Sequence, residues 1–369
     1  MRIAFVTYDF GEYSIRHANA LLEHADIMLV MPQQLAKPHQ AIINPEVDFR
    51  PFEMPRLRQP VRQLARIRWI LKQIAEYQPD LIHFQSGHLW FNFTLPLLKR
   101  RCPIVLTIHD PRQHVGDVGS RKTPQSVMDF GYRRADRVIV HGAQLKEVVH
   151  KEIGIDLDQI HVIPHIALGE AAREEAVLPK MDDAGPWILF FGRIWEYKGL
   201  EYLIRAQPKI TARFPDAKII IGGRGDDFQR YRDMMVDVSR FEIHNRWISD
   251  EERAQMFERA SVVVLPYIEA TQSGVVPIAY THLKPVIATR TGGLPDCVEH
   301  GKTGLLVPPR DEDAIADAII QLLADHDLRQ AMGQAGKEKL DNEGSPKVVA
   351  ARTAEVYRCA LGLATERAG

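Results

Sequence analysis

The sequence has few cysteines, no long apolar run and almost no net charge. Three of its 369 residues are cysteines, Cys102, Cys297 and Cys359, and they lie far apart. This small, odd number excludes a disulfide framework or a zinc-cysteine cluster and favours a reducing compartment. No uncharged apolar run approaches the roughly 18–20 residues of a membrane-spanning helix. The first apolar run, residues 3–6, is too short for a secretory leader, so we expect a cytoplasmic protein or one held at a membrane surface.

The charge balance also limits the classes of partner. Lysine and arginine number 47 and aspartate and glutamate 48, which gives a formal net charge of -1. We therefore expect no nucleic-acid partner, since any basic surface must be local. The hydrophobic fraction of 45% and charged fraction of 26% are those of an ordinary globular protein, and the length predicts two domains.

Short apolar runs alternate with helical patterns along most of the chain. The predicted strands are residues 3–6, 27–31, 81–84, 104–108, 138–140 and 161–163, followed by 187–191, 218–221, 262–265, 286–288 and 305–307. The intervening segments have apolar residues at three- and four-residue spacing, which indicates helices. Strands that alternate with helices predict the α/β class, with two doubly wound domains in tandem.

A polar, proline-bearing stretch separates the two series of strands. We therefore predict a first domain over residues 1–168, a linker over 169–185 and a second domain over 186–345. Residues 346–369 form a predicted helix with no strand after it, and we expect this helix to cross back and cover the first domain.

The first strand of the second domain ends in a loop with two cations. Arg193 and Lys198 follow Gly192, and a guanidinium and an ammonium five residues apart suit the oxygens of a diphosphate. The alternative is two solvated surface cations. Gly222 and Gly223 end the next strand, where glycine allows either close approach of a ligand or simply a tight turn.

A carboxylate and a predicted helix start follow the strand 262–265. Glu269 is placed to accept hydrogen bonds from sugar hydroxyls. The expected helix start consists of Gln272, Ser273, Gly274 and Val275. A hydroxyl cap followed by free amides would bind an anion there.

In the first domain, two residues follow strands in the same way. His109 comes after the strand 104–108 and can donate a hydrogen bond or transfer a proton, although a lone histidine is also a common structural residue. Gly11 follows the first strand, where its backbone could contact a ligand. Residues 301–304 imitate part of a phosphate-binding loop, but Asp296 stands where a Walker sequence needs glycine, which excludes an ATPase.

Taken in order, these motifs closely resemble the retaining glycosyltransferases of family 4. The resemblance rests on the loop from Gly192 to Lys198, on Gly222 and Gly223, on the Glu269 stretch and on residues 284–295, and is looser in the first half. It implies a GT-B fold, with two Rossmann-like domains facing across a cleft. It also implies a nucleotide-sugar donor in the second domain, a sugar or lipid-linked acceptor in the first, and transfer that needs neither metal nor cofactor.

The resemblance also implies roles for single residues. Arg193 and Lys198 would neutralise the leaving diphosphate, Glu269 would hold donor-sugar hydroxyls, and His109 would lie near the reacting sugar. The family pattern places a second glutamate eight positions after the first, but this chain has Pro277 there. A proline ring has no group for a ribose hydroxyl, so this contact departs from the pattern.

The segment 56–72 contains no acidic residue and many arginines. As a helix it would place Arg58, Arg62 and Arg66 on one face. Another face would carry Val61, Leu64, Ile67, Leu71 and Ile74 toward the core. The basic face is either solvated or a peripheral contact with anionic membrane lipid or a lipid-linked acceptor.

Two other functions are compatible with the same motifs. One is a catalytically silent sugar-nucleotide-binding protein, which Pro277 brings into consideration. The other is a nucleotide-sugar epimerase on the same fold; a phosphorylase is disfavoured because such enzymes are longer. Release of nucleoside diphosphate from a nucleotide sugar separates these alternatives.

Overall fold

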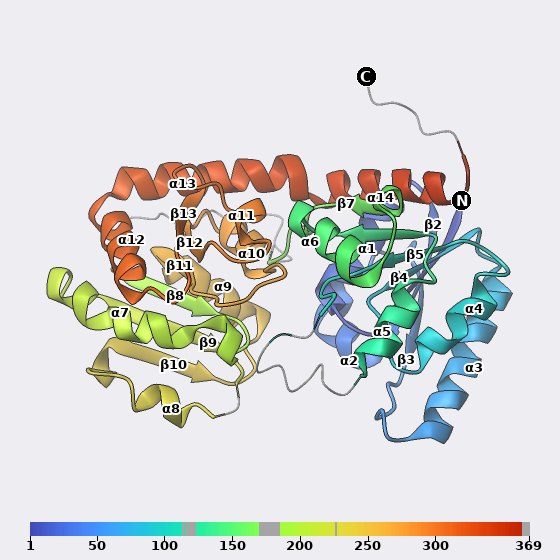
Figure 1. Ribbon diagram of the computed structural model, residues 1–369, viewed down its shortest axis with the longest axis horizontal. Helices are drawn as coiled ribbons and strands as arrows, with labels where there is room; N and C mark the ends of the chain where they lie inside the picture. The colour runs from blue at the N-terminus through green and yellow to red at the C-terminus, as the bar shows by residue number, and fades with distance from the viewer. Residues whose placement is uncertain (113, 115–122, 170–184, 226, 364–369) are drawn as a thin grey trace. The chain divides into compact units, whose positions relative to one another are not determined.

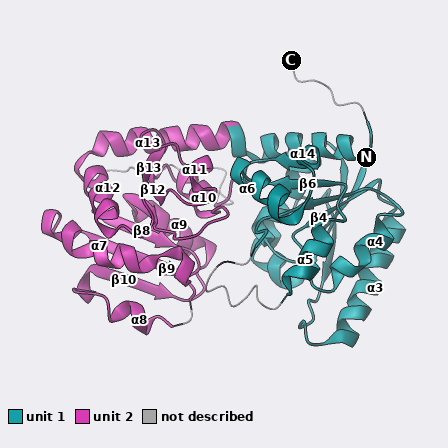
Figure 2. Ribbon diagram, in the orientation of Figure 1, with its two compact units in different colours: residues 1–113, 118–166, 343–369 teal, residues 114–117, 167–342 magenta. Residues whose placement is uncertain are grey.

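The computed structural model describes residues 1–112, 114, 123–169, 185–225 and 227–363. The chain divides into two compact units. Residues 1–113, 118–166 and 343–369 make up unit 1, and residues 114–117 and 167–342 make up unit 2 (Figure 2). Most of the predicted linker, residues 170–184, lies outside the described residues.

Unit 1 contains a parallel sheet of seven strands within the described residues. The strands are β1 (Arg2–Thr7), β2 (Asp26–Pro32), β3 (Asp48–Phe52), β4 (Leu81–Gln85), β5 (Ile104–Thr107), β6 (Arg137–Val140) and β7 (Ile160–Val162). Their order is β3-β2-β1-β4-β5-β6-β7, so it reverses direction between β1 and β4. The central strands are almost wholly buried, as expected for a sheet covered by helices on both faces.

The helices of unit 1 connect these strands (Figure 1). They are α1 (Gly11–Leu21), α2 (Gln33–Ala36), α3 (Pro60–Tyr77), α4 (Leu95–Leu98), α5 (Gln125–Tyr132), α6 (Ala143–Val148) and α14 (Pro346–Ala360). Although α14 follows unit 2 in the chain, it packs on unit 1. Its Thr353 hydroxyl lies 3.0 Å from His17 Nε2, and its Tyr357 hydroxyl lies 2.6 Å from His83 Nδ1.

Unit 2 contains a second parallel sheet, of six strands among the residues described. The strands are β8 (Trp187–Phe191), β9 (Lys218–Gly223), β10 (Phe241–Asn245), β11 (Val262–Leu265), β12 (Val286–Thr289) and β13 (Gly304–Val307). The order β10-β9-β8-β11-β12-β13 reverses direction between β8 and β11. This is the strand order of a Rossmann fold, so the predicted tandem of two doubly wound domains is confirmed.

Local sequence signals explain the ends of the unit 2 helices. These helices are α7 (Leu200–Arg213), α8 (Gln229–Arg232), α9 (Asp250–Arg259), α10 (Val275–Thr281), α11 (Leu294–Cys297), α12 (Glu312–Ala324) and α13 (His326–Lys339). A capping box between Ser249 and Glu252 starts α9. The Asp311 carboxylate accepts a hydrogen bond from the Ala314 backbone N–H and starts α12.

Two features of α3 correct the sequence prediction. Arg58 lies in the turn before the helix, because the chain becomes helical only at Pro60. Val61 and Leu64, predicted to face the core, are 79% and 48% exposed. The buried face consists of Gln63, Ile67, Ile70 and Ile74 instead. The extra buried position is polar but satisfied, since the Gln63 amide donates to the Pro55 carbonyl at 2.8 Å.

None of the helices among the described residues combines sufficient length with sufficient apolar character to cross a bilayer.

Candidate functional site

The sheet of unit 2 defines where a ligand is expected. In open α/β sheets, ligands bind beyond the carboxyl ends of the strands, at the point where the strand order reverses. In unit 2 that point lies between β8 and β11. The loops that leave these two strands carry Arg193 and Lys198 on one side and Glu269 on the other. The predicted residues of this unit therefore gather around the reversal point.

The glycines at the ends of β8 and β9 pack against each other. The Gly192 N–H donates to the Gly222 carbonyl at 2.9 Å. Gly223 has a φ of 145°, and a Cβ atom there would lie 1.8 Å from the Gly192 carbonyl oxygen. A side chain at Gly222 would meet the sulfur of Met256 at 2.7 Å. Close packing of the two loops therefore accounts for these glycines, in line with the tight-turn alternative.

Aromatic rings support both cations of the β8 loop. Lys198 ends a short helical turn, and its Nζ lies 3.7 Å from the ring centroid of Tyr267. The Arg193 guanidinium carbon lies 4.3 Å from the Trp195 ring centroid, and this side chain is exposed. Cation–π contacts of this kind hold a cationic group against a ring face. The two aromatic rings therefore help to position these side chains.

Tyr267 connects the Lys198 ammonium to the start of α10. Its ring is buried, and its hydroxyl lies 3.1 Å from Ser273 Oγ. Burial raises the pKa of Tyr267 well above its ordinary value, so the phenol stays neutral. The helix begins at Val275 as predicted, but Gly274 is its N-cap and no side chain caps it. Ser273 Oγ instead accepts a hydrogen bond from the Val275 N–H at 3.3 Å.

The carbonyl of Tyr197 holds the two loops together. It accepts backbone hydrogen bonds from Ile268 at 2.9 Å and from Glu269 at 3.4 Å. Gly292, with a φ of 48°, supports the same loop, since a Cβ atom there would lie 1.5 Å from the Ala270 carbonyl oxygen. The Glu269 carboxylate itself is 42% exposed. Rigid backbone thus presents a solvent-accessible carboxylate on the same loop pair as the two cations.

His114 is a residue of this site that the sequence analysis did not identify. It groups with unit 2, where its Nδ1 lies 3.8 Å from Glu269 Oε2 and its Nε2 lies 2.9 Å from Thr271 Oγ1. Its ring also stacks on Tyr197, with centroids 4.6 Å apart. A histidine about 150 residues away in the chain gives no local signal for this contact, so only the structure reveals it.

In unit 1, the structure places His109 just beyond β5 and buries it. Only 3% of the residue is exposed, and the Phe10 ring stacks on the imidazole with centroids 3.9 Å apart. Its Nδ1 lies 3.1 Å from His141 Nε2, and its Nε2 lies 2.5 Å from the Gln85 side-chain nitrogen. Burial, and next the neighbouring His141, hold the pKa of His109 well below its ordinary value. The ring is therefore neutral near pH 7.

Gly11 lies at the first position of α1 and not in an open loop. A Cβ atom at this position would lie 2.5 Å from the Leu35 carbonyl oxygen, so close backbone packing accounts for the glycine. Phe10 precedes it with a left-handed φ of 60°.

Two units, each with a parallel sheet whose strand order reverses once, define the GT-B class of glycosyltransferase folds. Residues 12–166 match the model described as Glycosyltransferase Family 4, and residues 185–325 match that described as Glycosyl transferases group 1. The chain belongs to this family of glycosyltransferases.

Individual relatives support the same assignment. An uncharacterized glycosyltransferase of Methanocaldococcus jannaschii is 30% identical over 302 residues, which is 76% of each chain. A GDP-mannose-dependent phosphatidylinositol monomannoside mannosyltransferase of Mycobacterium tuberculosis is 29% identical over 223 residues, or 56% of this chain and 54% of that protein. Among solved structures, Anabaena HepE with UDP and glucose superposes with a TM-score of 0.74 at 16% identity, covering 97% of this chain and 100% of that one.

Proposed function

We propose that the protein transfers a sugar from a nucleotide-sugar donor to a carbohydrate or lipid-linked acceptor, with retained anomeric configuration and without a metal ion. Unit 2 would bind the donor and unit 1 the acceptor. The observation that carries this proposal is the convergence of Lys198, Arg193 and Glu269 on the two loops at the strand-order reversal of unit 2. The nucleotide sugar is a substrate, and the proposal involves no cofactor.

The two cations would act on the leaving group. Cleavage of the bond between the sugar and the phosphate builds negative charge on the nucleoside diphosphate. Positive groups that are already fixed stabilise that charge without having to reorganise. The ring of Tyr267 fixes Lys198 in this way, and Trp195 supports Arg193. The main chain of residues 273–275 would contact the same phosphate and the sugar.

Glu269 and His109 would act on the sugars. The exposed Glu269 carboxylate would accept hydrogen bonds from donor hydroxyls. His109 would lie near the reacting carbon of the donor sugar; its Nδ1 and Nε2 face His141 and Gln85, so a hydrogen bond to the sugar would replace one of these contacts. The acceptor hydroxyl oxygen forms the new bond to that carbon as the carbon–phosphate-oxygen bond breaks. The hydroxyl proton passes to the departing phosphate oxygen on the same face, so this route needs no carboxylate nucleophile.

Hydrolysis of the donor tests this assignment. We expect slow release of nucleoside diphosphate from one of a panel of UDP-, GDP- and ADP-sugars, with chelator present and no metal added. Lys198→Ala and Glu269→Ala should each abolish most of this release. Lys209→Ala is the matched control, because Lys209 lies on the surface of α7, outside the two loops of the site, and forms an ion pair with Asp313 of α12. If the first two variants retain wild-type release, the site assignment is wrong.

A specific observation favours a second candidate function, a catalytically silent sugar-nucleotide-binding protein. Pro277 is buried in the first turn of α10, so its ring offers nothing to a ribose hydroxyl. Such a protein would show a thermal shift with a nucleotide sugar but release no diphosphate. The same panel of donors therefore separates the two functions.

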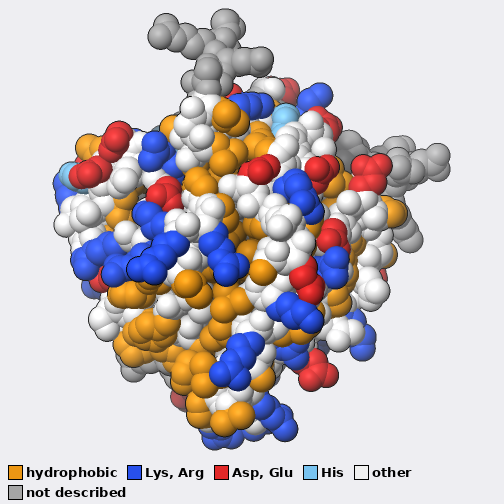
Figure 3. Space-filling model, turned by 90° about the vertical axis from the view of Figure 1, so that its right-hand side faces the viewer, with side chains coloured by type: hydrophobic (Ala, Val, Ile, Leu, Met, Phe, Trp, Pro, Cys, Tyr) orange, Lys and Arg blue, Asp and Glu red, His pale blue; other side chains and the backbone are white. Residues whose placement is uncertain are grey.

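We also propose peripheral contact with anionic membrane through the basic segment that holds Arg58, Arg62 and Arg66. The exposed side chains of Val61 and Leu64 support this contact. Figure 3, which views the molecule from the right-hand side of Figure 1, shows Lys and Arg side chains beside hydrophobic ones. Basic and apolar side chains together favour binding at a lipid surface. Equal sedimentation with neutral and anionic vesicles would contradict this contact.

A further inference from the structure

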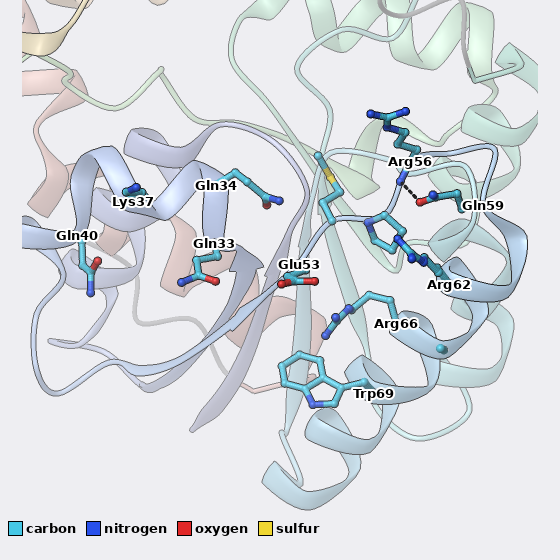
Figure 4. A pocket seen from close by; sticks show the side chains of 13 residues that line it. Gln33, Gln34, Lys37, Gln40, Glu53, Arg56, Gln59, Arg62, Arg66 and Trp69 are labelled. Carbon is cyan, nitrogen blue, oxygen red and sulfur yellow. Dashed lines mark hydrogen bonds between the residues drawn. The ribbon is translucent and has the colours of Figure 1, made fainter.

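A pocket of about 1090 Å³ opens at the carboxyl edge of the unit 1 sheet. Its walls come from three stretches of chain: α2 and the 3-10 helix Lys37–Ile42 that follow β2, the residues directly after β3, and the first turns of α3. Figure 4 shows these segments around the opening. The volume slightly exceeds the roughly 300–1,000 Å³ that is typical of small-molecule sites. The pocket lies on the side of the sheet where α/β folds bind ligands, beyond the carboxyl ends of the strands, but beside β2 and β3 and not at the strand-order reversal between β1 and β4.

The lining of this pocket is strongly positive. Lys37, Arg56, Arg62 and Arg66 contribute four cations, whereas Glu53 is the one carboxylate among the lining residues. None of the four cations forms an ion pair with any residue that the structure describes. The whole chain has a net charge of only -1, so this positive charge is concentrated at the pocket and is not a property of the protein as a whole. A concave wall of one sign of charge focuses its field on an ion of the opposite sign.

Arg66 is the most constrained of these cations. Its guanidinium carbon lies 5.3 Å from the Trp69 ring centroid and 5.8 Å from the Phe52 ring centroid. Its Nε is buried and has no hydrogen-bond partner in the described structure. A buried donor without a partner is costly, and native proteins rarely leave one unless a ligand or water supplies the acceptor. Figure 4 shows this side chain extending from α3 toward Glu53.

The remaining lining groups suit hydroxyl-bearing parts of a ligand. Four glutamines contribute amide donors and acceptors, and Trp69 contributes an aromatic face beside Arg66. Amides and a carboxylate satisfy hydroxyl groups, whereas the arginine fork matches two phosphate oxygens at once. The lining therefore combines groups for one anionic part and groups for a polyol or sugar part.

We propose that this pocket binds the acceptor through a phosphate group, held by Arg62 and Arg66, with a hydroxyl-bearing part against the glutamines. The inference rests on the proposed glycosyl transfer and narrows its acceptor to phosphorylated compounds. Such a phosphate can belong to a free sugar phosphate or to a lipid headgroup. The pocket recognises the chemistry that the two have in common.

The test compares two double variants of the full-length protein that remove the same charge from one helix. Arg62→Gln/Arg66→Gln acts inside the pocket, and Arg68→Gln/Lys72→Gln acts on exposed positions of α3 outside it. Calorimetric titration with a glucose monophosphate, and with glucose as the neutral match, covers the free source. Sedimentation with phosphatidylcholine vesicles, with and without phosphatidic acid, covers the lipid source.

We expect the wild type to bind the glucose monophosphate, the vesicles with phosphatidic acid, or both. It should not bind glucose or vesicles of phosphatidylcholine alone. The pocket variant should bind about tenfold more weakly or worse, and the control variant should bind as the wild type does. Loss in the soluble arm indicates a free sugar phosphate, and loss in the vesicle arm alone indicates a lipid headgroup. Equal loss in both variants, or no binding of either phosphorylated probe, would overturn the proposal.

Donor hydrolysis keeps this outcome separate from that of the proposed function. The wild type and the Arg68→Gln/Lys72→Gln control should both release nucleoside diphosphate, because that activity depends on Lys198 and Glu269 in unit 2, whereas phosphate binding depends on Arg62 and Arg66 in unit 1. Normal phosphate binding with no diphosphate release would contradict glycosyl transfer and leave the pocket assignment standing. The reverse pattern would contradict the pocket alone.

Discussion

The Lys198 ammonium lies over the Tyr267 ring, 3.7 Å from its centroid, and the hydroxyl of the same tyrosine lies 3.1 Å from Ser273 Oγ. One buried tyrosine thus supports a cation of the β8 loop with its π face and the loop before α10 with its hydroxyl. The ring and the hydroxyl make separable contributions.

Tyr267→Leu should lower the rate of nucleoside diphosphate release about tenfold, because loss of a desolvated cation–π contact costs roughly 1–2 kcal/mol. Tyr267→Phe keeps the ring beneath Lys198 and should retain most of the rate. It should cost about 1 kcal/mol of unfolding free energy, since Ser273 Oγ loses a partner. If the Phe variant loses as much rate as the Leu variant, the hydroxyl and not the ring positions the ammonium.

Gly223→Ala should lower the unfolding free energy by more than about 2 kcal/mol, as followed by the denaturation midpoint. The new Cβ would lie 1.8 Å from the Gly192 carbonyl oxygen, so the loops after β8 and β9 must separate. Gly301→Ala is the control, because Gly301 also has a positive φ, 79°, but no atom within 4 Å of its Cβ position. It should cost only about 1 kcal/mol of backbone strain. Equal costs would contradict the steric explanation.

Acid should destabilise unit 1 through its buried histidines. Burial lowers the pKa of His17 and of His141 to about 3 and that of His165 to about 4, from an ordinary 6.5. Below about pH 6.5 the unfolded chain binds protons that these rings exclude. The contribution of these rings to stability is therefore fully present above about pH 6.5, and it is lost as the pH falls toward their pKa values in the folded protein. At about pH 5 each ring accounts for a loss of up to about 2 kcal/mol.

Scanning calorimetry between about pH 7 and pH 5 measures this decline. His17→Gln should make the fall of Tm with acid less steep, because one buried ring no longer contributes. His326→Gln is the control, because this side chain on α13 is 41% exposed and not enclosed in the core of unit 1. An identical slope in all three proteins would contradict a role for His17.

Ile70→Ala and Leu64→Ala test which face of α3 meets the core. Ile70 is fully buried, so its truncation should cost about 2–5 kcal/mol of unfolding free energy. Leu64 is 48% exposed, and its truncation should change that free energy by no more than about 0.5 kcal/mol. Urea denaturation compares the two, and similar costs would show that both residues face the core.

The sequence predicted the central strands and the residues at their ends for one physical reason. A strand buried on both faces is a continuous apolar run, as in Val262 to Leu265, so its end and the loop that follows are easy to locate. Arg193, Lys198 and Glu269 occupy such loops. Two of the edge strands among the described residues lack this signal. Asp48–Phe52 and Phe241–Asn245 carry charged or polar residues, so no continuous apolar run marks them in the sequence, and neither was predicted.

The pocket of unit 1 and the position of His114 could not be predicted from local pattern. The arginines of α3 formed a recognisable basic segment, but nothing in the chain connected them with Lys37 or Glu53. Those contacts depend on the pairing of β2 with β3, and β3 was one of the missed strands. The core-facing side of α3 was predicted wrongly because Val61 and Leu64 are apolar but exposed, and residue type alone does not distinguish an exposed apolar residue from a buried one.

The return of α14 to unit 1 sets an order on biosynthesis. His17 and His83 meet Thr353 and Tyr357, so their partners are about the last residues of the described chain to leave the ribosome. Unit 2 is translated in full before that point, so the packing of α14 on unit 1 can be completed only after both sheets have been synthesised.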